Sequence, residues 1–170
     1  MSIRKLIRDV PDFPKPGILF KDFTPVLADG EAFAAVTHAL SGMARVHGAN
    51  HVLGIESRGF ILGTPVAHAL ALPFSPVRKP GKLPRAVRSV EYELEYGTDT
   101  LEIHSEDIGP DDRVVIVDDL LATGGTAEAA CRLAEACGAE VVAVLVMIEL
   151  TALGGAARLA PRHVYSLVKY

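Results

Sequence analysis

One stretch, VVIVDDLLATGGT at residues 114–126, constrains the fold more than any other part of the chain. Four β-branched apolar residues in succession, 114–117, predict a strand buried on both faces. Asp118 and Asp119 stand where we expect that strand to end. The stretch therefore predicts a buried strand that delivers two carboxylates to the edge of a sheet.

A short loop with two glycines follows the carboxylates. Thr126 can cap a helix that begins near Ala127, so the order is strand, glycine loop and helix start. Gly124 and Gly125 let a ligand approach the backbone closely, and free N–H groups at a helix start point toward an anion. This arrangement is typical of a phosphate site.

The paired aspartates need a different partner, because they would repel a phosphate. A ribose hydroxyl, a metal ion or a basic side chain could each fill that role. No Gly-Lys-Ser/Thr follows the loop and no G-x-G-x-x-G is present in it, so neither the Walker A nor the dinucleotide-binding motif applies.

Chain length, net charge and the length of apolar runs limit the class of protein. At 170 residues the chain is long enough for one domain, 1–170, with a substantial core. A formal net charge of −4 argues against general nucleic-acid binding, which usually needs a basic face. No apolar run reaches ~18 residues, and the N-terminus lacks the apolar core of a signal peptide. We therefore expect no membrane span and a cytoplasmic location.

Two cysteines and six scattered histidines add little chemistry. Cys131 and Cys137 fall in one predicted helix, about 9 Å apart along its axis. That separation is too long for a disulfide, so we interpret both as packing residues. The histidines form no H-E-x-x-H or Cys/His cluster, so no zinc site is predicted.

Strand and helix patterns alternate along the chain. Helices are predicted at residues 2–9, 29–47 and about 60–70, strands at 51–55, 74–79, 140–148 and 164–168, the last at a sheet edge, and a β-hairpin at 89–96 and 98–104. This order predicts an α/β fold with a mainly parallel, twisted sheet flanked by helices.

Ligands of such sheets bind beyond the carboxyl ends of the strands. That rule brings together four loops, at residues 56–59, 78–82, 118–126 and 149–150. The segment 78–88 holds five basic residues, two prolines and one glycine. Alone it is most simply a solvated loop, but beside a phosphate motif a mobile cationic lid is the better interpretation.

The central stretch resembles the phosphoribosyl pyrophosphate (PRPP) signature of the type I phosphoribosyltransferases. Four further stretches extend the resemblance over most of the chain and point to the branch that uses adenine: FPKPGILFKD at 13–22, ESRGF at 56–60, VRKPGKLP at 77–84 and YELEYG at 92–97. One departure is Lys21, where many relatives carry arginine. If that residue acts through its backbone, the change should be mild.

The resemblance implies a pentosyltransferase of purine salvage that converts adenine and PRPP to AMP and pyrophosphate. It also implies a homodimer, a small hood or lid region at 78–104 and a purine-binding segment at 13–22. Mg²⁺ is expected, held mainly by substrate oxygens and water and in addition by Asp118 or Asp119.

Residue roles are likewise implied by the resemblance. Residues expected to bind PRPP are Ser57, Arg58, Arg78, Lys79, Lys82, Asp118, Asp119, Ala122, Thr123, Gly124, Gly125 and Thr126. Among these, the loop 122–126 would hold the 5′-phosphate and Arg58 the pyrophosphate. A non-proline cis peptide between Glu56 and Ser57 is also implied.

Adenine is expected to bind against Leu19, Phe20, Lys21 and Leu150, with Phe20 and Leu150 on its two faces. Both could equally be plain core residues. The catalytic residue implied by the resemblance is Glu95, as the base that accepts the proton from adenine. The strand pattern alone would favour Glu91, Glu93 and Glu95 as three solvated carboxylates on one face.

Two other functions stay open at this point. A PRPP-sensing regulator would keep the fold without the chemistry, although such a protein should carry a nucleic-acid-binding surface or an extra domain. An enzyme of the same class could instead use hypoxanthine, guanine or xanthine.

Overall fold

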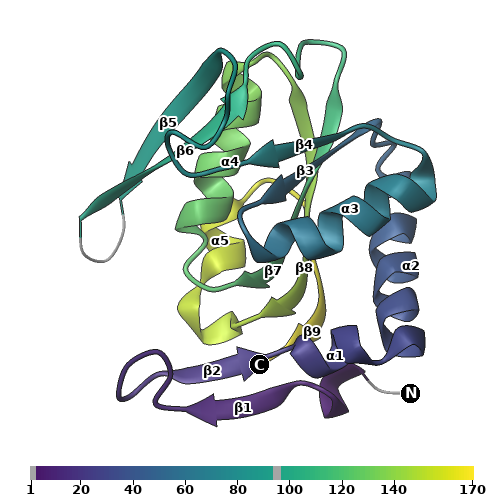
Figure 1. The fold of residues 1–170 in the computed structure, drawn as a ribbon, viewed down its shortest axis with the longest axis vertical. Helices are drawn as coiled ribbons and strands as arrows, with labels where there is room; N and C mark the ends of the chain where they lie inside the picture. Colours follow the sequence, from purple (N-terminus) through teal and green to yellow (C-terminus); the bar gives the residue numbers. More distant parts are fainter. Residues whose placement is uncertain (1–2, 94–96) are drawn as a thin grey trace.

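A computed structural model of the chain describes residues 3–93 and 97–170. Within these residues, a parallel sheet of five strands has the order β4-β3-β7-β8-β9 (Figure 1). The strands are β3 (His51–Ile55), β4 (Phe74–Val77), β7 (Arg113–Leu121), β8 (Glu140–Glu149) and β9 (Val164–Lys169). The predicted α/β fold is confirmed, and β9 lies at the edge as expected.

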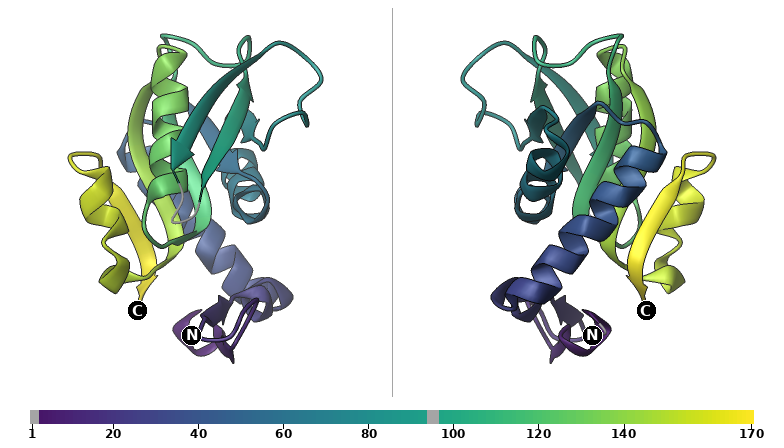
Figure 2. Two further views of the ribbon diagram at one scale, coloured as in Figure 1. Left: turned by 90° about the vertical axis from the view of Figure 1, so that its left-hand side faces the viewer. Right: turned by 90° about the vertical axis from the view of Figure 1, so that its right-hand side faces the viewer.

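Helices cover both faces of this sheet (Figure 2). On one face lie α1 (Thr24–Ala28), α2 (Gly30–Val46) and α3 (Arg58–Leu70); on the other lie α4 (Gly125–Ala136), α5 (Gly155–Leu159) and the hairpin of β5 (Val87–Glu93) and β6 (Thr98–His104). Each face has its own apolar core. The 3₁₀ turns are η1 (Ile3–Lys5) and η2 (Thr151–Leu153).

The central strand, β7, is stabilised by the burial of its apolar side chains on both faces of the sheet. Val114, Val115, Ile116 and Val117 have no exposed surface, and β3 and β8 pair with β7 on its two sides. Such a strand has no polar face, which is why its sequence is uniformly apolar rather than alternating.

Helix α2 follows its predicted boundaries because its ends are capped. The Asp29 carboxylate accepts a hydrogen bond from the Ala32 N–H at 2.9 Å. After the helix, Gly48 has a φ of +63°, a conformation that glycine adopts at little cost.

The predictions for residues 2–9 and 74–79 need correction. The helix expected at 2–9 is only η1, and β1 (Arg8–Pro11) then pairs with β2 (Leu19–Asp22), because a partner strand outweighs the weak helical pattern of so short a segment. The strand expected at 74–79 ends at Val77, because Arg78 pairs with Glu102 of β6 instead.

No helix in the described part of the chain is long and apolar enough to cross a membrane. Cys131 is buried within the core and Cys137 is half-buried, and neither forms a disulfide. Burial raises the pKa of Cys131 to about 12, which agrees with a packing residue.

Candidate active site

A pocket of about 300 Å³ opens at the carboxyl end of β7. Its lining contains most of the residues expected to bind PRPP: Ser57, Arg58, Lys79, Asp118, Asp119 and residues 122–126. Glu56, Tyr92, Leu101 and Val146 also line it. Three of the four predicted loops, 56–59, 78–82 and 118–126, therefore contribute to one pocket as the parallel-sheet rule predicts, whereas residues 149–150 do not line it.

The glycine loop leads directly into α4. Gly124, with a φ of +85°, is the N-cap residue, and the first helical bond runs from the Glu128 N–H to the Gly124 carbonyl at 2.8 Å. Thr126 therefore lies inside the first turn and is not the cap that we predicted, because the glycine turn itself starts the helix. Since the first N–H groups of a helix have no intrahelical acceptor, this end suits an anion.

Gly155 fits tightly behind this loop. A Cβ atom at Gly124 would lie 2.9 Å from the Gly155 carbonyl oxygen, and one at Gly155 would lie 2.4 Å from the Ala122 carbonyl oxygen. Both positions accept only glycine, since the neighbouring atoms are backbone. The start of α5 thus fixes the shape of the glycine loop, a contact that was not predicted from the sequence although the Gly154-Gly155 pair is present there.

The aspartates lie within β7, which continues to Leu121, and not after its end as we expected. The strand is longer because β8 pairs with it as far as Leu121 and Glu149. Burial raises the pKa of Asp118 well above its usual range, and the charge of Asp119 raises it further. Burial also raises the pKa of Asp119, although the Arg58 guanidinium opposes this shift.

From the raised pKa values of this pair we expect it to destabilise the ligand-free fold at neutral pH, so Asp118→Asn should raise the melting temperature. An acid whose pKa is raised by folding costs stability above its folded pKa, and the cost disappears below its unfolded pKa, ~3.9. Each kcal/mol recovered corresponds to about 2–4 °C for a chain of this size. The measurement is a thermal melt of both proteins from pH 8 to pH 4.

The gain should shrink as the pH falls, because protonation relieves the same repulsion in the wild type. Asp111→Asn is the matched control, since Asp111 is exposed. A gain that is equal at pH 8 and pH 4, or a lower melting temperature for Asp118→Asn at pH 8, contradicts this account of the acidic pair.

Arg58 contacts both the acidic pair and Phe20 of β2. It is the first residue of α3, and its Nε lies 2.8 Å from Oδ2 of the buried Asp119. Its guanidinium carbon lies 5.4 Å from the centre of the Phe20 ring. The peptide between Glu56 and Ser57 is cis, as the resemblance implies.

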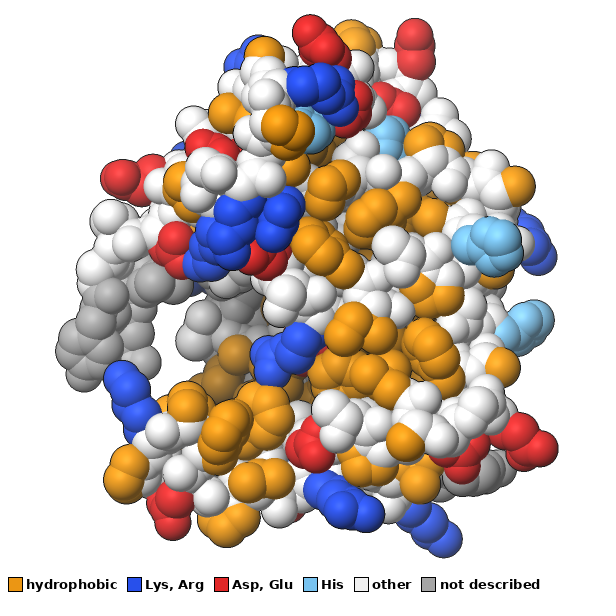
Figure 3. All heavy atoms as spheres, in the orientation of Figure 1, with side chains coloured by type: hydrophobic (Ala, Val, Ile, Leu, Met, Phe, Trp, Pro, Cys, Tyr) orange, Lys and Arg blue, Asp and Glu red, His pale blue; other side chains and the backbone are white. Residues whose placement is uncertain are grey.

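The start of the basic loop, residues 78–82, also reaches this pocket. Lys79 lines it, whereas Arg78 and Lys82 contact Glu56, which lines it. Figure 3 shows basic side chains gathered with acidic ones among them beside a hollow in the surface. Within the described residues each of these three cations has an acidic partner: Glu56 for Arg78 and Lys82, and Asp99 for Lys79.

None of the residues expected to bind adenine lines the pocket, although Phe20 and Leu150 contact the lining residues Arg58 and Leu121. Leu19 is half exposed. Phe20 is half-buried, and the Phe20 ring packs edge-on against the Phe13 ring with the centroids 5.1 Å apart. Lys21 is buried, and its Nζ contacts Asp9 at 2.6 Å. The Leu150 N–H donates to the Leu121 carbonyl at 2.9 Å, and Leu150 packs partly into the core below α2 and α3.

Glu95, the expected catalytic base, lies outside the described residues. The hairpin on which it falls is described up to Glu93 and again from Gly97. Glu91 and Glu93 are exposed, and neither lines the pocket at β7.

Comparison with known proteins agrees with this geometry. Residues 26–169 match the family model of the phosphoribosyl transferase domain. The adenine phosphoribosyltransferase of Streptomyces clavuligerus is 57% identical over 155 residues, which cover 91% of this chain and 87% of that protein.

Solved structures give the same result. The crystal structure of adenine phosphoribosyltransferase from Thermoanaerobacter pseudethanolicus has a TM-score of 0.96 at 48% identity, covering 99% of this chain and 98% of that one. The enzyme from Saccharomyces cerevisiae, solved with an imino-altritol bisphosphate and adenine, has a TM-score of 0.92 at 36% identity and covers 98% and 96% of the two chains.

The fold and the pocket define a phosphoribosyltransferase. With relatives this similar over nearly their whole length, the chain belongs to the adenine phosphoribosyltransferase family.

Proposed function

We propose that this protein transfers the 5-phosphoribosyl group of PRPP to adenine. The bond between N9 of adenine and C1′ of the ribose forms while the bond from C1′ to the pyrophosphate oxygen breaks. A proton leaves N7 of adenine, and the products are AMP and pyrophosphate. The observation that carries the proposal is one pocket containing a glycine loop at a helix start, the adjacent carboxylates of Asp118 and Asp119, and the basic side chains of Arg58 and Lys79.

Each group has a task in this reaction. The backbone of residues 122–126 would bind the 5′-phosphate, and the basic side chains of Arg58, Lys79 and Lys82 would bind the pyrophosphate. Asp118 and Asp119 would face the ribose hydroxyls. C1′ becomes positively charged as the pyrophosphate departs, so most of the rate enhancement is expected from positioning and from charge stabilisation.

The acidic pair also fits a hard cation such as Mg²⁺. Two adjacent carboxylates whose pKa values are raised by burial and mutual repulsion gain stability when a cation neutralises them. When bound, Mg²⁺ neutralises charge on the pyrophosphate, and Asp118 or Asp119 would hold it directly or through water. The homodimer and the cytoplasmic location stay predictions, as do the lid at 78–104 and the purine-binding segment at 13–22.

One assay tests the proposal. The purified chain is incubated with PRPP, Mg²⁺ and either adenine, hypoxanthine, guanine or xanthine, and release of pyrophosphate is followed. We expect turnover with adenine far above that with the other bases. Binding of PRPP without turnover of any base would favour the sensing regulator instead.

Selection of adenine is expected to depend on backbone groups of β2. The Leu19 carbonyl would accept from the exocyclic amine, and the Lys21 N–H would donate to N1. Hypoxanthine presents an oxygen and an N1–H there, so both backbone groups would lose their partners at about 1–3 kcal/mol each. We expect kcat/KM for hypoxanthine to be at least about tenfold lower than for adenine.

Lys21→Arg is the matched control for this prediction. It changes the side chain that contacts Asp9 and keeps the backbone N–H, so the ratio of kcat/KM for the two bases should be unchanged. Equal efficiency of the wild type with adenine and hypoxanthine would exclude these backbone groups as the basis of selection.

A further inference from the structure

Glu56 lies where two segments of the site meet. It follows β3 and directly precedes Ser57 and Arg58, and its side chain is only 11% exposed. Burial acts to raise the pKa of this carboxyl. Hydrogen bonds from the Lys82 side chain, the Lys79 N–H and the Arg78 side chain outweigh burial, so the pKa of Glu56 lies below its usual value.

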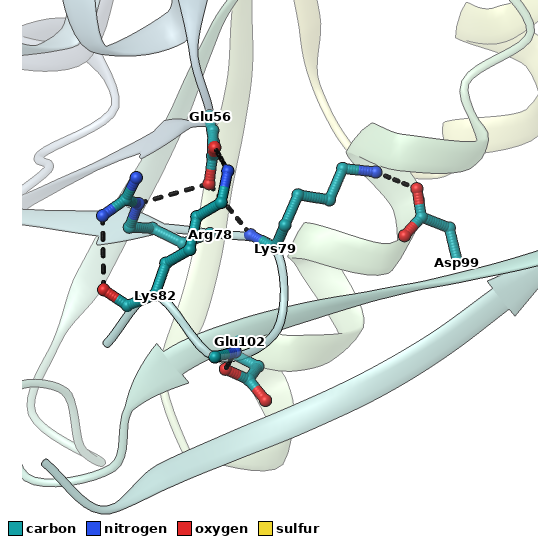
Figure 4. A network of polar contacts seen from close by, with 7 residues as sticks. Glu56, Arg78, Lys79, Lys82, Asp99 and Glu102 are labelled. Atoms are coloured by element: carbon teal, nitrogen blue, oxygen red, sulfur yellow. Dashed lines mark hydrogen bonds and ion pairs between the residues drawn. The ribbon is translucent and has the colours of Figure 1, made fainter. Parts of the chain in front are cut away.

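Three donors from residues 78–82 converge on this carboxylate (Figure 4). Oε2 accepts from Arg78 Nε at 3.2 Å and from the Lys79 N–H at 3.0 Å, and Oε1 accepts from Lys82 Nζ. Arg78 also donates through Nη1 to the Lys82 carbonyl at 3.2 Å. Glu56, Arg78 and Lys82 therefore form a closed set of contacts in which each residue touches the other two.

The opposite side of this turn is held by β6. The N–H and carbonyl of Arg78 bond to the backbone of Glu102, and the Gly81 N–H donates to the Glu102 carboxylate at 3.1 Å. These bonds fix the backbone of the turn, whereas only Glu56 among the described residues holds the Lys82 ammonium. The Lys82 side chain is 45% exposed, so its remaining N–H donors are open to a ligand.

We propose that Glu56 is a positioning residue for pyrophosphate binding, and that it acts by holding Lys82 and Arg78 beside the pocket before the ligand arrives. The inference rests on the proposed function and adds a residue to it. A lysine side chain has many rotamers, and fixing it in advance removes an entropy cost from binding. The Glu56 side chain is largely shielded from solvent, its lowered pKa favours the ionised form, and it contacts both cations.

Glu56→Gln tests this role because it keeps the size of the side chain and removes its charge. We expect the Kd of the full-length chain for magnesium pyrophosphate, measured by calorimetry, to rise about tenfold. KM for PRPP should rise by a similar factor, while KM for adenine and kcat at saturating PRPP stay within about twofold. Affinity equal to or tighter than that of the wild type overturns the proposal, and tighter binding would identify Glu56 as a competitor of pyrophosphate.

A double-mutant cycle separates positioning from a general loss of structure. If Glu56 acts largely through Lys82, Glu56→Gln should weaken pyrophosphate binding only about twofold to threefold in a Lys82→Ala background. If the double variant raises the Kd by the product of the two single-variant factors, the two residues are not coupled, and the proposal that Glu56 acts through Lys82 is wrong. Glu106→Gln is the matched control, because Glu106 pairs with Arg85 at the other end of the same loop, where both side chains are exposed. It should leave the Kd unchanged.

Glu56→Asp keeps the charge but cannot reach all three donors, so we expect its Kd to lie about threefold above that of the wild type. If a thermal melt shows that Glu56→Gln does not fold, Glu56→Asp is the deciding variant. An unchanged Kd of Glu56→Asp for pyrophosphate then overturns the proposal.

The role of Glu56 can be tested separately from the proposed function, because pyrophosphate binding needs no adenine. Failure of the wild type to convert adenine would therefore remove the proposed function and leave the role of Glu56 to be decided by binding.

Discussion

Glu95→Gln is expected to lower the turnover of adenine roughly 10²–10⁴-fold, the usual contribution of general acid–base catalysis. Neutral adenine attacks C1′ through N9 only if a proton leaves N7 as the bond forms. A carboxylate can accept that proton in the forward direction and return it in the reverse direction. Glutamine keeps the shape and a hydrogen bond but cannot act as this base. The measurement is kcat at saturating adenine and PRPP, together with the Kd for PRPP, which should change little.

Glu91→Gln and Glu93→Gln are the matched controls. Both glutamates are exposed on β5, and neither lines the pocket, so both variants should be nearly as active as the wild type. If Glu95→Gln turns over within a few-fold of the wild type, the base is water or another residue. If all three variants lose activity alike, the effect belongs to the acidic hairpin as a whole.

Gly124→Val is expected to abolish useful PRPP binding, with a loss of about 10²-fold or more, because small displacements in a preorganised site have effects of that size. From the sequence alone, the expected cause is a side chain that occupies the space of the phosphate. The structure gives a different cause. The first side-chain atom would clash with the backbone of Gly155, at a φ of +85° that a β-branched residue rarely adopts. The loop must therefore move, and its N–H groups move with it.

Gly154→Ala controls for the backbone strain in this experiment. Gly154 also has a positive φ, +71°, but a Cβ atom there would meet nothing within 4 Å. We expect this variant to keep its PRPP affinity within a few-fold. Direct titration with PRPP and a thermal melt should be run on both variants. Unchanged PRPP binding by Gly124→Val would remove this loop from the phosphate site.

The sequence predicted the parts of this molecule whose causes are local. A run of β-branched residues gave β7, helical spacing with Asp29 and Gly48 gave α2, and the glycine loop gave the start of α4 to within two residues. The rule that ligands bind at the carboxyl ends of parallel strands then placed the pocket correctly. Residue roles within the pocket came from the resemblance and stay predictions.

What the sequence did not predict depends on contacts between distant segments. The first strand forms only because residues 19–22 pair with it, and β7 extends past its apolar run because β8 lies alongside. Glu56 looked like part of a binding loop, but its three donors come from residues 78–82. No periodicity within either segment carries that information.

The close backbone contact of Gly155 with Ala122 and Gly124 has a consequence for folding during synthesis. The glycine loop at 122–126 and Gly155, which shapes it, are separated in the chain by all of α4 and β8. During translation, a nascent chain whose residues 114–126 have already been synthesised still lacks Gly155, the residue against which the glycine loop packs. Ribosome-bound chains stalled before Gly155 should therefore not retain PRPP, whereas chains carried clear of the ribosome by an added C-terminal linker after residue 170 should.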